Sequence, residues 1–424
     1  MPNLTVVGAQ WGDEGKGKVV DLLTEKADVV IRFAGGNNAG HTLVVDGRTV
    51  VVHLLPSGVV RERCICMLGD GMVVDPAALQ QEMESVAAAG IDLTGRLKVS
   101  GRAHLILPYH LILDALRETT REALGTTKRG VGPAYEDKAA RRGIRVIELL
   151  RPDRLEKRLA VAVEEANARI ARQGGKTVDF QDMLDFCVEH GKRLAPYITD
   201  VSHELDLAIK AGKSVLFEGA QGLLLDLDHG TYPFVTSSTT LAGGASPGIG
   251  VSPAMLGNVV GVTKAYLTRV GEGPMPSQDD GEAGHHLATV GHEVGATTGR
   301  PRRCGWLDLV ALRYAVRVSG IRYLALTKLD VLAGMGAIKV CVGYRLNGQE
   351  LSLPPMDTAD WSLVEPIYRE VEGFDSLEGV SDFADLPPAA KAYVRMIEQD
   401  LAVKVALVSV GPGREASLPL HGVW

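Results

Sequence analysis

The sequence predicts an α/β fold, built on a large, mainly parallel sheet with helices on both faces. Short apolar runs recur along the chain without strict alternation of apolar and polar residues, as strands covered on both faces require. Amphipathic helical patterns separate these runs, which is typical of strand-helix-strand units. Four runs lead directly into glycine-rich or polar segments, and open α/β sheets bind ligands at the carboxyl ends of their strands. We therefore expect one shared binding site at that edge.

The apolar runs and helical patterns locate the main elements. Strands are expected at residues 4–7, 28–33, 214–217, 259–265, 323–327 and 403–408, and helices at residues 76–89, 154–172 and 307–318. Asp46-Gly47 lies between two β-rich runs within residues 43–55 and predicts a hairpin outside the main sheet. Residues 151–213 are more polar and predict helical insertions that form a lobe. Because no Pro/Ser-rich linker marks a boundary, we expect one domain over residues 1–424.

Composition excludes several classes of protein. The chain has 424 residues and a formal net charge of -7, and no Lys/Arg-rich run indicates a nucleic-acid surface. Its five cysteines are an odd number without metal-ligand spacing, which favours a reducing compartment over a disulfide framework. A strand begins almost at the first residue and no apolar run reaches membrane-spanning length, so a cytoplasmic protein without membrane contact is expected.

A phosphate loop is predicted after the first strand. The segment Gly12-Asp13-Glu14-Gly15-Lys16-Gly17-Lys18 fits the template GxxxxGK of phosphate-loop nucleotide-binding folds. Such loops cradle phosphate with backbone N–H groups and a lysine, and hold magnesium with a Ser or Thr hydroxyl. Val19 occupies the hydroxyl position, so another oxygen must bind the metal. Asp13 is the nearest candidate, and a carboxylate there is also suited to take a proton from a substrate. On this segment alone, a simple turn that closes a βα unit remains an alternative.

A guanine site is predicted at a second strand end. Thr327-Lys328-Leu329-Asp330 is close to the NKxD motif with which GTP-binding proteins hold guanine. A carboxylate accepts hydrogen bonds from the N1–H and the exocyclic amine of guanine, whereas adenine offers no such donor pair. A strand-end lysine with a capping aspartate is the alternative. Together with the phosphate loop, the motif favours GTP over ATP.

Three further segments carry polar groups on glycine-rich backbone. Gly35-Gly36-Asn37-Asn38-Ala39-Gly40-His41-Thr42 contains His41, which is suited to donate to a phosphoryl group during transfer, although a turn histidine looks the same. Residues 125–135 are basic and suit a second phosphate, and a mobile surface loop would look similar. Residues 293–306 join hydroxyls with three arginines, which suit a carboxylate. These motifs predict a GTP-dependent phosphoryl-transfer enzyme with a second anionic substrate.

Five strings, in the same order along nearly the whole chain, resemble the adenylosuccinate synthetase family. They are Gln10-Trp11-Gly12-Asp13-Glu14-Gly15-Lys16-Gly17-Lys18, Gly36-Asn37-Asn38-Ala39-Gly40-His41-Thr42, Gly132-Pro133-Ala134-Tyr135-Glu136-Asp137-Lys138, residues 228–238 and Thr297-Thr298-Gly299-Arg300-Pro301-Arg302-Arg303. The resemblance implies a GTP-dependent ligase that joins IMP to L-aspartate, giving adenylosuccinate, GDP and phosphate, in AMP biosynthesis. It departs from the family pattern at Ala34, Leu223 and Gly413.

The resemblance also implies a role for each site residue. Asp13 takes the N1 proton of IMP and ligates Mg²⁺, the carbonyl of Gly40 adds a second ligand, and the 6-oxygen attacks the γ-phosphate to form 6-phosphoryl-IMP. Lys16, His41 and Gln221 complete the catalytic set, with His41 on the transferring phosphoryl group and Gln221 at the 6-position. Arg141 reaches the IMP phosphate of the neighbouring subunit, which makes a homodimer part of the site.

The binding residues implied by the resemblance fall into three sets. GTP is expected to contact Gly12, Glu14, Gly15, Lys16, Gly17, Lys18, Gly40, Thr42, Arg302, Lys328, Leu329, Asp330, Ser409, Val410 and Gly411. IMP is expected to contact Asp13, Asn38, Thr127, Arg141, Gln221, Thr236 and Arg300. Aspartate is expected to contact Ala296, Thr297, Thr298, Gly299, Arg300 and Arg302.

Two alternatives remain open from the sequence. A regulatory GTPase would use the phosphate loop and the TKxD motif as a switch, but it leaves the two basic loops unexplained. A carboxylate-amine ligase would also activate an oxygen with a nucleotide and capture it with an amine. Dependence on IMP separates that ligase from the family named above.

Overall fold

The centre of the molecule is a ten-stranded sheet with the order β20-β19-β15-β11-β1-β10-β2-β5-β7-β9. The computed structural model describes residues 3–38, 40–45, 48–120, 123–295 and 299–424. Neighbouring strands pair in parallel except for β19 and β20, which are antiparallel. The strands are β1 (Asn3–Gly8), β2 (Val29–Arg32), β5 (Ile65–Leu68), β7 (Leu97–Ser100), β9 (Ile198–Thr199), β10 (Val215–Glu218), β11 (Asn258–Lys264), β15 (Tyr323–Thr327), β19 (Lys404–Ser409) and β20 (Ser417–Pro419). The six expected strands and the mainly parallel sheet are confirmed.

Successive side chains of the central strands enter two different cores, one on each face of the sheet. Leu4 and Val6 of β1 pack in one cluster, whereas Val7 packs in the other. Val30 of β2 joins the first cluster and Ile31 the second. This alternation is the reason why both faces of these strands are apolar in sequence.

Helices cover both cores, as expected. The cluster that contains Leu4 is covered by α1 (Lys16–Leu23), α2 (Pro76–Ala88), α3 (Pro108–Arg117), α5 (Pro152–Arg172) and α6 (Phe180–Leu194). The cluster that contains Val7 is covered by α7 (Val201–Lys210), α8 (Ala245–Ile249), α9 (Glu282–Val290), α10 (Leu309–Ser319) and α12 (Pro388–Leu401). The expected helix at residues 307–318 begins two residues later, because the Asp308 carboxylate caps it by accepting from the N–H groups of Val310 (2.9 Å) and Ala311 (3.0 Å).

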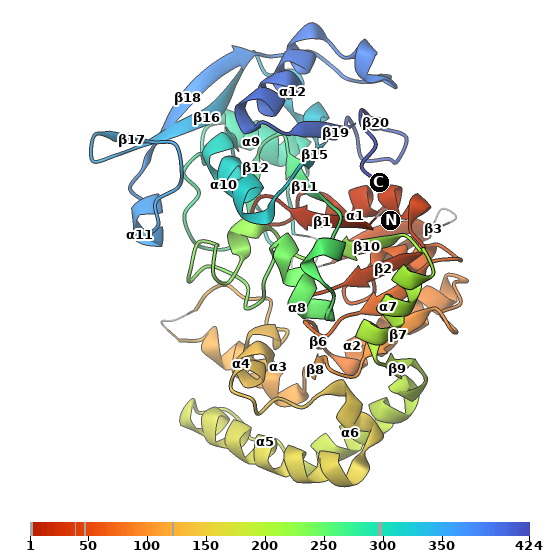
Figure 1. The fold of residues 1–424 in the computed structure, drawn as a ribbon. Coiled ribbons are helices and arrows are strands. Elements are labelled where there is room, and N and C mark those ends of the chain that lie inside the picture. The colour runs from red at the N-terminus through yellow and green to blue at the C-terminus, as the bar shows by residue number, and fades with distance from the viewer. Residues whose placement is uncertain (1–2, 39, 46–47, 121–122, 296–298) are drawn as a thin grey trace.

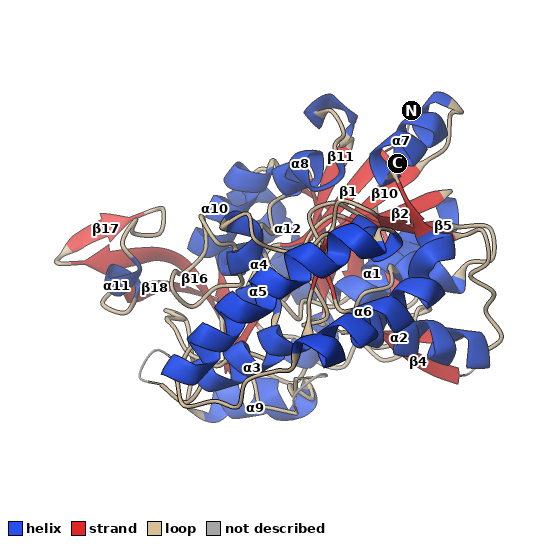
Figure 2. Cartoon of the chain, turned by 90° about the horizontal axis from the view of Figure 1, so that it is seen from below, coloured by secondary structure: helices blue, strands red, loops and turns tan. Residues whose placement is uncertain are grey.

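Two peripheral parts extend from opposite ends of the sheet. In Figure 1, α5 and α6 lie at one end of the molecule, beside α3 and α4 (Val131–Ala139). At the other end a ribbon projects outward, as Figure 2 also shows for its strands β16, β17 and β18. The ribbon comprises β16 (Ala337–Leu346), β17 (Gln349–Leu351) and β18 (Glu365–Glu372), with β14 (Leu307–Asp308) paired to β16 and α11 (Thr358–Trp361) in the connection. The sequence analysis did not identify this ribbon. Whether residues 151–213 form a separate lobe stays a prediction.

The smaller strands form pairs beside the main sheet. The expected hairpin is present as β3 (His41–Val45) and β4 (Arg48–Val52), antiparallel, with Val45 opposite Arg48. β12 (Leu267–Arg269) pairs with β13 (Arg303–Gly305), and β6 (Val73–Val74) pairs with β8 (His104–Leu105).

None of the helices in the described part of the chain has the length and apolarity needed to span a bilayer.

Candidate active site

The segment between β1 and α1 forms a tight loop because three of its residues adopt left-handed backbone conformations. Gly12 and Gly15 have φ angles of 85° and 86°, which glycine adopts without a steric penalty. Asp13 has a φ of 59°, a conformation that aspartate tolerates better than most residues. Its side chain is 43% exposed and lies at the cavity described below. The helix α1 starts at Lys16, so its first N–H groups face the loop.

Glu14 shapes this loop from inside the protein. Its carboxylate is fully buried, accepts from the N–H groups of Gln10 (3.0 Å) and Gly12 (2.9 Å), and pairs with the ammonium of Lys16 at 2.6 Å. The hydroxyl of Thr327, from the end of β15, donates to the carbonyl of Glu14 at 2.6 Å. Glu14 therefore stabilises the conformation of the loop. Lys16 does so too, through its ion pair with Glu14, and it also lines the cavity.

Lys18 joins the phosphate loop to the end of β19. Its ammonium donates to the hydroxyl of Ser409 and to the carbonyl of Gly411, both at 2.7 Å. Burial lowers the pKa of Lys18 to about 8, although the carboxylates of Asp330 and Glu415 act in the opposite direction. Two segments from opposite ends of the sequence therefore meet here.

Asp330 presents an unused acceptor beside this contact. Its Oδ1 atom is buried and has no hydrogen-bond partner among the described residues. Burial raises the pKa of Asp330, and the neighbouring ammonium groups of Lys18 and Lys328 offset part of that rise. A buried acceptor without a partner costs about 1–3 kcal/mol, so a ligand that brings donors to this point gains that energy. Leu329 and Val410, which were also expected to contact GTP, are buried, and like Asp330 they do not line the cavity described below.

His41 is held by a buried carboxylate that the sequence analysis did not assign. The Nδ1 atom of His41 lies 3.0 Å from Oε1 of Glu218, at the end of β10, and 3.1 Å from the hydroxyl of Ser57. Glu218 is fully buried and also accepts from the N–H (2.8 Å) and the hydroxyl (2.9 Å) of Ser57. Burial alone would raise the pKa of Glu218, but its hydrogen bond with His41 and the charge of Arg32 lower it overall. The carboxylate therefore fixes the ring orientation of His41, which lines the cavity.

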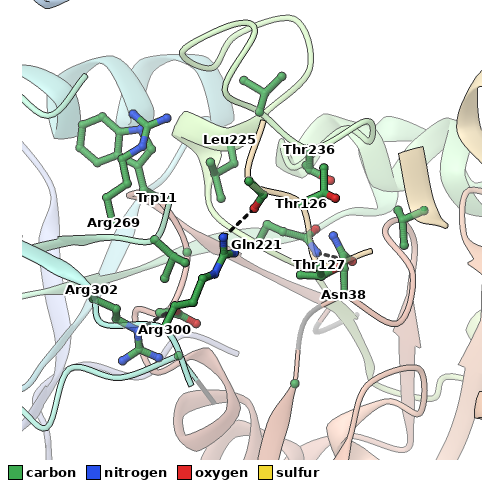
Figure 3. Close-up of a pocket in the computed structure, with 18 of the residues that line it drawn as sticks. Trp11, Asn38, Thr126, Thr127, Gln221, Leu225, Thr236, Arg269, Arg300 and Arg302 are labelled. Atoms are coloured by element: carbon green, nitrogen blue, oxygen red, sulfur yellow. Dashed lines mark hydrogen bonds and ion pairs between the residues drawn. The ribbon is translucent and has the colours of Figure 1, made fainter. Parts of the chain in front are cut away.

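A cavity of about 490 Å³ lies at the carboxyl ends of the central strands. Figure 3 shows residues from distant segments around it, with Gln221 and Asn38 pointing toward one another. Of the predicted site residues, those that line it are Gly12, Asp13, Gly15, Lys16, Gly17, Lys18, Asn38, Gly40, His41, Thr127, Gln221, Thr236, Arg300, Arg302 and Lys328. The expectation that polar strand ends meet at one edge is confirmed by the contacts of Thr327 with Glu14, Ser409 with Lys18 and Glu218 with His41.

One side of the cavity carries amides and hydroxyls. Gln221 adopts a φ of 56°, its Nε2 donates to Oδ1 of Asn38 at 2.9 Å, and its own Oε1 is buried without a hydrogen-bond partner among the described residues. The guanidinium of Arg300 donates to the carbonyl of Gly125 at 2.9 Å, which joins the two basic loops across the cavity. Thr127 and Thr236 complete this side. The free oxygen of Gln221 is suited to accept from a donor on a purine or an amine.

The other side carries charges close to the phosphate loop. The Nε of Arg302 donates to Oδ2 of Asp13 at 2.8 Å, and its NH1 donates to the buried Glu293 at 2.6 Å. Arg269 is 2% exposed, and its guanidinium carbon lies 5.3 Å from the ring centre of Trp11. Burial lowers the pKa of Arg269 to about 9, and the nearby charge of Arg303 acts in the same direction.

Some predicted residues lie outside the cavity lining. Arg141 is exposed on the surface after α4, and Gly299 has a φ of 65° in the loop that carries Arg300. Ser409 and Gly411 are connected to the cavity through Lys18. Ala296, Thr297 and Thr298 lie outside the described residues, and so does the side chain of Thr42.

Several cavity residues were missed by the sequence analysis. Among them are Trp11, Asp114, Arg117, Leu124, Leu225, Phe234, Arg269, Val270 and Glu272. Trp11 adjoins the phosphate loop and could have been found from that position. Arg269 carries no local signal, because it ends a short strand outside every motif identified in the sequence. Among the described residues, no group of three or more His, Cys, Asp or Glu side chains forms a metal site by itself.

The comparisons with known proteins agree with this geometry. The adenylosuccinate synthetase family model matches residues 5–418. The adenylosuccinate synthetase of Stenotrophomonas maltophilia is 49% identical over 423 residues, which cover 99% of this chain and 98% of that protein. The enzyme of the same name from Thermoanaerobacter sp. is 49% identical over 425 residues, covering 99% and 100%.

A solved structure is similar over the whole fold. The fully ligated adenylosuccinate synthetase of Plasmodium falciparum superimposes with a TM-score of 0.94 at 38% identity, covering 99% of this chain and 100% of that one. The family match over nearly all residues, the relatives at 49% identity and this structural agreement lead to one conclusion. The chain belongs to the adenylosuccinate synthetase family, whose members are GTP-dependent ligases.

Proposed function

We propose that this chain joins IMP to L-aspartate through a 6-phosphoryl-IMP intermediate and releases GDP and phosphate. The observation that carries the proposal is the common cavity. It combines a phosphate loop with Asp13 at its tip, a carboxylate-held histidine and an amide oxygen without a partner at Gln221. No regulatory switch needs the last two features.

In the first step, Asp13 accepts the N1 proton of IMP, so that the 6-oxygen attacks the γ-phosphorus of GTP. A bond forms between that oxygen and the phosphorus while the bond from phosphorus to the β,γ-bridging oxygen breaks, and GDP leaves. The exposure of the Asp13 side chain supports this role, since the carboxylate is within reach of a ligand. His41, oriented by Glu218, donates to the phosphoryl oxygens as the transfer proceeds.

In the second step, the amine of aspartate attacks carbon 6 of the intermediate. The new C–N bond replaces the C–O bond, phosphate leaves with the electron pair of the C–O bond, and the proton lost by the amine passes to the departing phosphate. The unpartnered oxygen of Gln221 is suited to accept a hydrogen bond from the aspartate amine and so to orient it beside the 6-position. Arg300 and Arg302 line the cavity and are suited to hold the carboxylates of aspartate, together with Thr297, Thr298, Ala296 and Gly299 of the same loop.

Lys328 and Asp330 give the preference for guanine in this proposal. The buried Oδ1 of Asp330 lacks a donor among the described residues, and guanine supplies two donors on one edge. Adenine supplies none there, so ATP would leave this carboxylate without a partner. The discrimination between the two nucleotides therefore follows from the cost of a buried acceptor.

Mg²⁺ is expected to be held by the carboxylate of Asp13 and the carbonyl of Gly40. Both are oxygen donors, as Mg²⁺ prefers, and a site with few protein ligands suits an ion that also binds substrate phosphates and water. When bound, the ion neutralises charge on the phosphates. The two donors lie at the same cavity, so the residues present fit the ion.

We also propose a cytoplasmic homodimer. All five cysteines are buried and unpaired, which supports a reducing compartment. Arg141 is exposed and its side chain has no partner among the described residues of its own chain, which supports its assignment to the IMP phosphate of a neighbouring subunit. Sedimentation of the natural chain with and without IMP tests the assembly, and a monomer with full activity would contradict it.

The proposed reaction is tested by measuring adenylosuccinate formation from IMP, aspartate, GTP and Mg²⁺. Parallel reactions omit each acceptor in turn or replace GTP with ATP. Product in the complete GTP reaction alone supports the proposal. GTP hydrolysis that is indifferent to IMP and aspartate would indicate a switch, and product from another acid without IMP would indicate a carboxylate-amine ligase.

A further inference from the structure

Glu293 is a buried carboxylate that holds side chains from three separate segments. It is 2% exposed. Lys264 donates to both of its oxygens at 2.8 Å, Lys328 donates to Oε1 at 2.7 Å, and Arg302 donates to Oε2 at 2.6 Å. The hydroxyl of Tyr266 also donates to Oε1. One carboxylate is therefore shared by three cations.

This carboxylate stays charged throughout the pH range of an enzyme assay. Burial alone would raise the pKa of Glu293, but the ammonium groups of Lys264 and Lys328 lower it to about 2. The Lys264 side chain is fully buried, and burial lowers its pKa to about 8 despite the charge of Glu293. Glu293 and Lys264 do not line the cavity, so they act on ligands only through other residues.

Two of the three cations lead to opposite ends of the proposed nucleotide site. Lys328 belongs to the TKxD motif at the guanine end and is 32% exposed at the cavity. Arg302 contacts Asp13 at the reacting end, with 2.8 Å between its Nε and Oδ2 of the carboxylate. The carboxylate of Glu293 thus contacts one residue expected to recognise guanine, Lys328, and one residue that contacts Asp13, Arg302.

The main chain connects Glu293 to the loop that carries Arg300 and Arg302. The N–H of Arg302 donates to the carbonyl of Glu293 at 3.0 Å, and the N–H of Glu293 donates to the carbonyl of Ala288 at 2.9 Å. Both ends of the segment 293–302 therefore meet at Glu293. A shift of this residue changes the base of the loop as well as the orientation of Arg302.

We infer that Glu293 is a positioning residue that couples the guanine end of the site to its Asp13 end by holding Lys328 and Arg302 against one carboxylate. The inference rests on the proposed function. When a base changes the contacts of Lys328, the share of Glu293 available to Arg302 changes as well. The strength with which Glu293 holds Arg302 then determines two properties of Arg302. One is how easily it breaks its ion pair with Asp13, and the other is how well it binds a substrate carboxylate. Couplings of this kind are typically about 5- to 150-fold in an equilibrium constant.

The test is a cycle of variants that isolates the coupling. Lys328→Ala is made in two backgrounds. One is the natural chain, and the other is the paired variant that carries both Lys264→Met and Glu293→Gln. Removing the ammonium and the carboxylate together avoids an unpaired buried charge, and such exchanges are often tolerated. The readouts are the KM values for GTP and for aspartate in the adenylosuccinate assay, with thermal unfolding of each variant as the measure of folding.

In the natural chain, Lys328→Ala is expected to raise the aspartate KM by about fivefold or more, in addition to the GTP KM. The reason is that Glu293, once it loses the charge of Lys328, holds Arg302 more strongly and leaves it less free to bind the ligand. In the paired background the effect on the aspartate KM is expected to fall below about twofold, while the effect on the GTP KM persists. A purely structural role for Glu293 would change stability and would leave this difference between backgrounds at zero.

Equal effects of Lys328→Ala on the aspartate KM in both backgrounds would overturn the inference. Glu148→Gln is the matched control, because Glu148 is also 2% exposed and pairs with Arg158 at 3.2 Å outside the cavity lining. It should preserve the full effect. If the paired variant unfolds, Glu293→Asp replaces it, since the shorter side chain keeps the charge but cannot reach all three cations. A natural chain that forms no adenylosuccinate would refute the proposed reaction instead.

Discussion

Replacing Asp13 with asparagine separates its chemical role from its structural one. Asparagine keeps the size of the side chain and tolerates the left-handed backbone at φ 59°. The side chain is 43% exposed and accepts a hydrogen bond from Arg302 at 2.8 Å. The carboxylate is partly exposed and Arg302 keeps its second ion pair with Glu293, so the free energy of unfolding should change by only about 1 kcal/mol.

The activity should change far more than the stability. Removal of a general base alone costs about 10²- to 10⁴-fold. Asp13 is also a proposed ligand of Mg²⁺, so the loss in kcat should reach about 10⁴-fold or more, which corresponds to about 5.5 kcal/mol of transition-state free energy. The GTP KM should rise much less, since Lys16 and the helix N-terminus remain in place.

The assay is initial-rate formation of adenylosuccinate at saturating substrates, with thermal unfolding in parallel. Asp21→Asn is the matched control, because Asp21 of α1 also pairs with an arginine, Arg61, at 2.8 Å but does not line the cavity. It should retain activity within about twofold, as surface substitutions usually cause small changes. If the Asp13 variant remained within tenfold of the natural enzyme, the assignment of Asp13 as the base would be wrong.

Three further outcomes are expected. Glu218→Gln should lower kcat by about 10- to 100-fold without raising the GTP KM, because it weakens a charge-assisted contact of 3.0 Å to His41. A raised GTP KM at constant kcat would contradict this role of Glu218. Asp330→Asn should raise the GTP KM by about 10- to 100-fold and leave the IMP KM nearly constant. It should also improve turnover with XTP, because the amide can donate to the 2-oxo group of xanthine. Parallel losses for IMP and GTP would argue against a contact between Asp330 and the nucleotide base. Burial, aided by the charge of Lys138, lowers the pKa of His104 to about 4 from 6.5, so the unfolded chain binds more protons between these values and stability should rise with pH across that window. That slope, worth up to about 3 kcal/mol, should be absent in His104→Gln when unfolding by urea is measured from pH 4 to 7, and identical slopes would refute the assignment.

Much of the sheet could be predicted because its central strands are buried on both faces. Val29, Val30 and Ile31 are all fully buried, so this strand needs no polar side chain to face solvent. A continuous apolar run is therefore sufficient to indicate the strand. The phosphate loop was predictable because left-handed backbone such as that of Gly12 and Gly15 favours glycine. The β3–β4 hairpin was predictable because Asp-Gly between two β-rich runs is typical of a tight turn, although Asp46 and Gly47 themselves lie outside the described residues. Local chemistry was sufficient for these elements.

The β16–β18 ribbon was harder to predict for a physical reason. Its strands are partly exposed, so their apolar residues are interrupted by charged ones such as Lys339 and Arg369. Strand identity there depends on pairing between residues distant in sequence, as with Val340 opposite Arg369. A window of local sequence does not contain that information.

The same limit applies to the candidate site. The phosphate-loop template indicates the type of residue at Lys18, but its contact with Ser409 arises from the order of strands in the sheet. In sequence, Glu218 looks like any polar residue at the end of a buried strand. Its contact with His41, which the structure shows, is what indicates its role. Glu293 likewise becomes informative once Lys264, Lys328 and Arg302 are seen around it.

The contact between Lys18 and Ser409 joins residues 391 positions apart, and this separation has a consequence for biosynthesis. A growing chain on the ribosome carries the phosphate loop from the start, yet it lacks β19 and its loop until nearly all of the sequence has been translated. Residues near the start of the chain must therefore wait for their partners. Nascent chains interrupted before residue 404 would expose the edge of β15 and leave Lys18 without Ser409 and Gly411, so incomplete products would be prone to associate through that edge.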